Sequence, residues 1–172
     1  TAVNAPLDEG SGDESWWSVV DLMVRALARE FRPTFIVSQH GCDTHAWDPL
    51  AHLRVTTESY RRACELVDRL AHEYAGGRWF ATGGGGYDAY RVVPRSWAMV
   101  WLAQAHRDVP AETPPAWRER WAEAARDYGQ APPPAALVDP PGTAPPDSDA
   151  VIDRNRGRAE RSLDEALRLL AG

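Results

Sequence analysis

Residues 78–87 read RWFATGGGGY, and this stretch decides how the fold is interpreted. Its first half is a short apolar run typical of a β-strand, and it leads directly into four glycines and Tyr87. A similar run, TFIVSQ at residues 34–39, comes just before a polar loop over 40–53. Because the run at 34–39 does not alternate apolar with polar residues, it favours a strand that is buried on both faces of a parallel sheet.

Helical patterns surround the two strands. Apolar residues recur at three- and four-residue steps from Trp16 to Phe31, and again from Tyr60 to Tyr74. The second helix starts near Thr56 and ends at Gly76. A third covers roughly 88–106, with Pro94 as a kink or a late start. The order helix, strand, helix, strand, helix predicts an α/β fold with a parallel sheet and flanking helices.

The character of the chain changes in its last third. We expect helices at 117–128 and 149–171, joined by a semi-rigid proline-rich connector over 132–146. The sequence therefore divides into residues 1–108, which form the α/β domain, and residues 109–172, a tail whose two helices pack on that domain.

Composition narrows the class of protein. The chain is 44% hydrophobic and 26% charged, as is ordinary for a globular protein, and its net charge of −6 does not favour a nucleic-acid partner. No apolar run in the sequence approaches the roughly 18 residues of a membrane span. Cys42 and Cys64 form neither a disulfide framework nor a paired metal-ligand motif, so we expect a cytoplasmic protein. The start at Thr1, without methionine or signal region, is what we expect of an internal segment.

The loops that follow the two strands are the candidate site. Ligands bind parallel sheets at the carboxyl ends of the strands, and one crossover helix brings both loops to the same edge, so we expect them to meet. The first loop holds six side chains that can ligate metals: His40, Cys42, Asp43, His45, Asp48 and His52. No pair of them has the spacing of a closed zinc site, so a metal site and a solvated polar loop both remain open.

The glycine run also has two readings. It lacks the dinucleotide-binding pattern and the Gly-Lys-Ser/Thr of a phosphate loop, so a nucleotide role is not indicated. The run either allows a substrate to approach the backbone closely, with Tyr87 at the mouth, or is a simple turn with a packing tyrosine.

The order of these motifs resembles the zinc-dependent histone deacetylase superfamily. GCDT at 41–44 is followed by DPL at 48–50 and then by GGGGY at 83–87. More narrowly, GGRW at 76–79 and RVVPRSW at 91–97 are similar to its bacterial acetoin-utilisation branch. The resemblance runs nearly from end to end of the chain.

This resemblance implies an arginase-like deacetylase fold and hydrolysis of the amide of an acetylated lysine. The zinc ion of the family is held by two aspartates and a histidine, and Asp43 matches one of the aspartates. Tyr87 matches the tyrosine that hydrogen-bonds the acetyl oxygen of the substrate. Gly85 and Gly86 would let the acyl chain pass close to the backbone, and Leu50 would line its channel.

The remaining zinc ligands of the family match a segment that would precede Thr1. The resemblance therefore implies the C-terminal half of a deacetylase, which alone neither holds zinc tightly nor hydrolyses substrate. The complete protein is expected to act in acetoin or acetate metabolism, with an acetylated acyl-CoA synthetase as a candidate substrate. The alternatives are an acetylpolyamine amidohydrolase of the same superfamily, or a non-catalytic remnant or interaction module.

Overall fold

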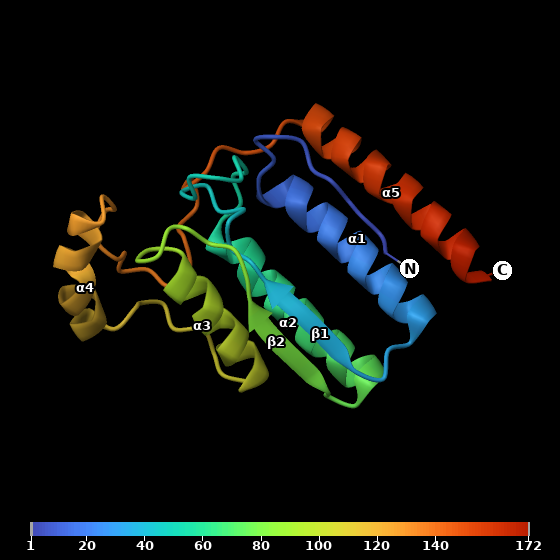
Figure 1. Ribbon diagram of the computed structural model, residues 1–172, viewed down its shortest axis with the longest axis horizontal. Coiled ribbons are helices and arrows are strands. Elements are labelled where there is room, and N and C mark those ends of the chain that lie inside the picture. The colour runs from blue at the N-terminus through green and yellow to red at the C-terminus, as the bar shows by residue number, and fades with distance from the viewer. Residues whose placement is uncertain (1, 172) are drawn as a thin grey trace.

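The computed structural model, which describes residues 2–171, confirms the predicted α/β fold (Figure 1). β1 and β2 pair in parallel, with Ile36 opposite Trp79 and His40 opposite Gly83, and α2 is the crossover between them. The elements in chain order are α1 (Asp13–Phe31), β1 (Ile36–His40), α2 (Thr57–Ala75), β2 (Trp79–Gly83), α3 (Val93–Gln104), α4 (Pro115–Asp127) and α5 (Asp149–Ala171).

Helix α2 begins and ends at its capping residues. The Thr56 hydroxyl accepts a hydrogen bond from the backbone N–H of Glu58 at 3.3 Å, which satisfies one of the free donors of the first turn. At the other end, Gly76 adopts the left-handed conformation (φ 59°) that closes many helices and favours glycine. These residue types explain why the predicted boundaries of α2 are correct.

Helix α3 is shorter than predicted at its start. The expected helix covered residues 88–106, whereas α3 begins at Val93 with Pro94 in its first turn. Proline is well suited to the first turn of a helix because its missing N–H has no partner there. Of the two readings of Pro94, the late start is therefore confirmed.

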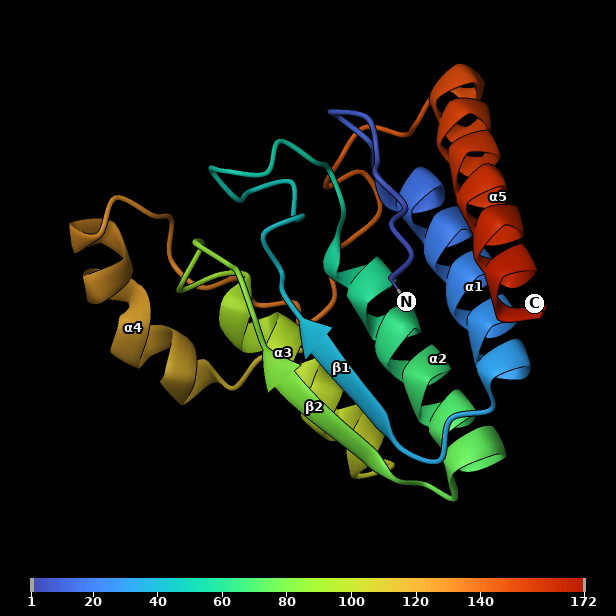
Figure 2. The same cartoon turned by 45° about the vertical axis from the view of Figure 1, so that its right-hand side comes forward.

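The sheet is covered on one face only. Figures 1 and 2 show α2 and α3 on the same side of both strands, where Trp79 and Ala81 join the core. On the opposite face, Phe80 is exposed and Val37 is 67% exposed. Successive side chains of a strand point to opposite faces, and no element among residues 2–171 packs over the second one. The prediction that both faces are buried is therefore wrong for this chain.

The C-terminal helix lies along α1 (Figure 1). Leu163 of α5 packs with Met23 of α1 in a small apolar cluster. Asn155 is fully buried, where its amide accepts from the N–H of Asp8 at 3.0 Å and donates to the Ser11 hydroxyl at 2.8 Å. The tail thus holds both α1 and the segment that leads into it, while the domain division after residue 108 stays a prediction.

Two smaller observations complete the fold. Phe31, the last residue of the apolar pattern predicted for α1, is exposed in the last turn of that helix. No helix in the described part of the chain is long and apolar enough to cross a membrane.

Candidate functional site

The two loops meet at the carboxyl edge of the sheet, as predicted (Figure 2). The N–H of Cys42 in the first loop donates to the carbonyl oxygen of Gly85 in the second at 2.6 Å. A second link joins Asp48 to Tyr87, whose N–H donates to the Asp48 carboxylate at 2.7 Å. Asp43 and Tyr87 are therefore carried by two loops that are hydrogen-bonded to each other.

Glycines at 85 and 86 make this close contact sterically possible. A Cβ atom at Gly85 would lie 2.7 Å from Cγ of Asp43, which is closer than real Cβ atoms come to any neighbour. At Gly86 it would lie 2.5 Å from the Cys42 sulfur, and φ there is 153°. The structure thus gives both glycines a packing role, which is to admit the first loop. Their predicted role beside an acyl chain stays a prediction.

Asp48, one of the possible metal ligands of the first loop, has a different role that sequence reasoning missed. Its buried carboxylate accepts from the N–H of Leu50 at 2.9 Å and from the N–H of Tyr87 at 2.7 Å, and so it fixes both loops at once. Aspartate before a proline commonly forms a turn by hydrogen-bonding the backbone two residues on, as Asp48 does with Leu50. That signal predicts the turn, but the link to Tyr87 depends on the tertiary fold.

The backbone of Tyr87 is held from both sides while its side chain stays accessible. Beyond the Asp48 contact, its carbonyl oxygen accepts from the Gln130 amide at 3.0 Å, and the Gln130 side-chain oxygen accepts from the N–H of Tyr90 at 3.2 Å. The Tyr87 side chain is 49% exposed, and Leu50 on the first loop is also exposed. The phenol is therefore mounted on a fixed backbone and faces outward at the strand ends.

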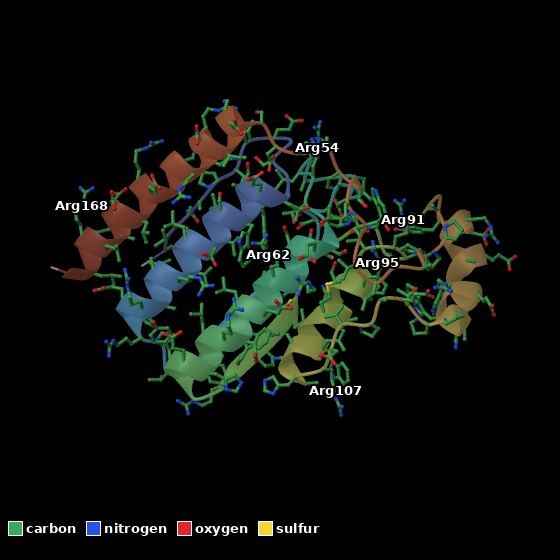
Figure 3. All side chains as sticks on the ribbon, turned by 180° about the vertical axis from the view of Figure 1, so that it is seen from behind. Arg54, Arg62, Arg91, Arg95, Arg107 and Arg168 are labelled. Atoms are coloured by element: carbon green, nitrogen blue, oxygen red, sulfur yellow. The ribbon has the colours of Figure 1, made fainter. Side chains whose placement is uncertain are left out.

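His45 is a structural residue and not a free metal ligand. Its ring is fully buried, and Nδ1 accepts from the N–H of Trp47 at 3.0 Å, so Nε2 carries the proton and donates to Asp139 at 2.9 Å. Arg95, labelled in Figure 3 at the start of α3, donates to the other oxygen of Asp139 at 2.8 Å. Both ring nitrogens of His45 are thus occupied.

Asp139 anchors the proline-rich connector beneath the first loop. Burial by itself would raise the pKa of this carboxyl, but the hydrogen bond from His45 and the positive charge of Arg95 outweigh burial and hold the pKa well below its usual range. The hydroxyl of Thr57, in the first turn of α2, also donates to the carboxylate at 2.8 Å. Asp139 is therefore an anion near neutral pH, and it joins the connector, the loop, α2 and α3.

The buried thiols and His40 are poor metal ligands. Burial raises the pKa of Cys42 to about 11 and that of Cys64 to about 12, so both thiols stay protonated near neutral pH, whereas a ligand must be a thiolate. His40 is the last residue of β1, and its Nε2 lies 2.7 Å from the Ser38 hydroxyl. Asp43 stays the candidate ligand of this loop because the resemblance to the deacetylases assigns it that role.

The residues of this chain do not by themselves form the zinc site that the resemblance implies. A catalytic zinc takes about three protein ligands and an open position. Among residues 2–171, Asp43 belongs to no group of three side chains able to hold a metal ion. The half-buried carboxylate of Asp43, packed against the backbone of Gly85, therefore offers one ligand of such a site.

The sequence matches a known class of protein. The family model of the histone deacetylase domain matches residues 1–104, and the chain belongs to this family. Within it, the chain is 44% identical over 118 residues to the acetoin utilization protein AcuC of Bacillus subtilis (strain 168), which covers 69% of this chain. It is 36% identical over 120 residues to the AcuC proteins of Staphylococcus xylosus and Staphylococcus aureus (strain N315). The chain spans about 30% of the length of these curated relatives.

Proposed function

We propose that this chain supplies the catalytic tyrosine and one metal ligand of a zinc-dependent lysine deacetylase. The observation that supports the proposal is the pairing of the two loops, which brings Asp43 and Tyr87 to one edge of the sheet through the Cys42–Gly85 hydrogen bond of 2.6 Å. Asp43 is one ligand of the zinc ion in this proposal, and the others come from a part of the polypeptide outside this chain.

The role of Tyr87 in this proposal is to stabilise negative charge. Hydrolysis of an acetyl-lysine amide develops charge on the acetyl oxygen, and the phenol hydroxyl of Tyr87 donates a hydrogen bond to it. Donors are most effective when they are already in place before the reaction. The hydrogen bond from the Tyr87 N–H to Asp48 and the one from the Gln130 amide to the Tyr87 carbonyl oxygen support this, because they fix the backbone that carries the phenol.

The substrate in this proposal is an acetylated lysine of a protein. The matched relatives are named for acetoin utilization, which suggests a substrate from acetoin or acetate metabolism, such as an acetylated acyl-CoA synthetase. Exposure of Tyr87 at the surface is compatible with a protein-borne lysine that enters from solvent.

The test is Tyr87→Phe in the complete gene product, with Tyr128→Phe as the matched control. Both side chains are exposed, but Tyr128 follows α4 and packs on Tyr90. Removing one oxyanion donor typically lowers kcat about 10²–10³-fold, so we expect that loss for Tyr87→Phe and an unchanged rate for the control. Full activity of Tyr87→Phe on an acetyl-lysine peptide would show that the catalytic tyrosine is misassigned. Faster turnover of acetylspermidine than of the peptide would favour the polyamine alternative.

A further inference from the structure

A second group of metal-ligating side chains lies away from the paired loops. Asp68 and His72 are one helical turn apart on α2, and His106 lies two residues beyond the end of α3. The two Nε2 atoms are 3.2 Å apart, and Asp68 Oδ1 lies 3.4 Å from Nε2 of His106 and 3.6 Å from Nε2 of His72. Three ligand atoms from two helices thus converge on one point.

We propose that Asp68, His72 and His106 form a binding site for a tetrahedral divalent transition metal ion, for which Zn²⁺ is the probe. With metal–ligand bonds of about 2.0–2.1 Å, neighbouring ligand atoms of a tetrahedral zinc site are about 3.3–3.4 Å apart. The three separations, 3.2, 3.4 and 3.6 Å, are centred on this spacing. An octahedral ion with the same bond lengths needs about 2.9 Å, which is shorter than all three.

The backbone at His106 is an independent observation. The N–H of Arg107 donates to the carbonyl of Leu102 at 2.9 Å, and the N–H of His106 donates to that of Ala103 at 3.1 Å. This pair of bonds closes a helix with a left-handed residue, and glycine is the usual residue there. His106 holds that position with φ 48°, which brings its imidazole against α2. The left-handed position at residue 106 thus carries a histidine where glycine is favoured, and imidazole is a side chain that can bind a metal ion.

Hydrogen bonds among the three side chains do not use all of their ligand atoms well. Two imidazole nitrogens 3.2 Å apart can share one proton, which leaves the Asp68 oxygen at long distances of 3.4 and 3.6 Å from them. A metal ion uses a lone pair of all three atoms at once. Asp68 is 22% exposed at its side chain, against 54% for His72 and 61% for His106, so an ion has access from solvent and a fourth position is open.

The site is separate from the paired loops. Helix α2 runs back from the carboxyl edge of the sheet, so its C-terminal half lies towards the opposite edge, where α3 also ends beside it. Arg107, the residue after His106, marks this end of α3 in Figure 3. An ion bound here would clamp the end of α3 to α2 and would not depend on Asp43. It would also change the expectation that the chain alone holds no zinc tightly.

Calorimetric titration of the 172-residue chain with Zn²⁺ tests the proposal. The variants are His72→Ala and His106→Asn, and the matched control is His52→Asn. His52 is exposed and has φ 55°, so it shares with His106 both its exposure and its left-handed backbone, which asparagine tolerates. Asp43→Asn is the second control, because it removes the candidate ligand of the proposed deacetylase site.

We expect one zinc ion per chain, with Kd raised at least about 100-fold by either ligand variant, since loss of a mere outer-shell partner already costs about 10–100-fold. The two controls should bind as the unmodified chain does. Zinc should also raise the Tm of the unmodified chain but not that of His72→Ala. The proposal is overturned if the unmodified chain shows no saturable binding, or if binding survives both ligand variants. Dependence on Asp43 would assign the ion to the deacetylase site instead.

Discussion

Asp139→Asn is the substitution that most directly tests how the first loop is held. The side chains of Asp139 and Arg95 are both 1% exposed, so the amide leaves the guanidinium buried without its anion, and it also weakens the acceptor of the His45 proton. Breaking a buried ion pair by neutralising one partner costs about 3–5 kcal/mol. With a urea m value of about 2 kcal/mol per M, the unfolding midpoint should fall by about 1.5–2.5 M.

Urea titration followed by tryptophan fluorescence measures this shift. The matched control is Asp149→Asn, an exposed aspartate at the start of α5, which should change the free energy of unfolding by no more than about 0.5 kcal/mol. If Asp139→Asn unfolds at the same urea concentration as the control, the buried ion pair contributes nothing net, and the argument that Asp139 anchors the loop is refuted.

Three further outcomes follow from the geometry. Gly85→Ala should lower stability by about 1–3 kcal/mol, because its Cβ collides with Asp43, and thermal unfolding checks this; an unchanged Tm would show that the loops adjust freely. Because the folded-state pKa of Asp139 is lowered, its stabilisation is present above the unfolded pKa of about 3.9 and is lost as pH falls through the folded value. Urea midpoints below pH 4 should therefore decline less steeply in Asp139→Asn than in the unmodified chain. Thr56→Ala should cost about 1 kcal/mol through loss of the α2 cap, whereas Thr56→Ser should retain it in the same unfolding assay.

Local chemistry explains which parts of the fold were predictable. Thr56 and Gly76 act on their own backbone neighbours, so the limits of α2 follow from residue type alone. The meeting of the two loops follows from strand order, because parallel strands joined by one crossover end at the same edge, and the Cys42–Gly85 hydrogen bond confirms it. The prediction that the strand is buried on both faces was wrong. The apolar side chain of Val37 indicates a strand suited to burial, but it does not show whether another element covers that face.

Contacts between distant segments account for what sequence reasoning missed. Asp139 is one acid in a proline-rich connector, and only the fold places it against His45 and Arg95. The spacing of Asp68 and His72 on one helix is visible in the sequence, but the third member, His106, comes from the end of another helix. No periodicity or motif links such residues, so a structure was needed to find them.

The anchoring of the first loop by Asp139 has a consequence for synthesis in the cell. His45 and Asp139 are separated by 94 positions. Because translation proceeds at about 5–20 residues per second, Asp139 is synthesised roughly 5–20 s after His45. Until Asp139 is made, the Nε2–H of His45 lacks its acceptor, and Arg95, which lies 44 positions before Asp139, lacks its anion for the last part of that interval. The strands and α2 can form on the ribosome, but the geometry of the paired loops becomes final only after the connector has emerged.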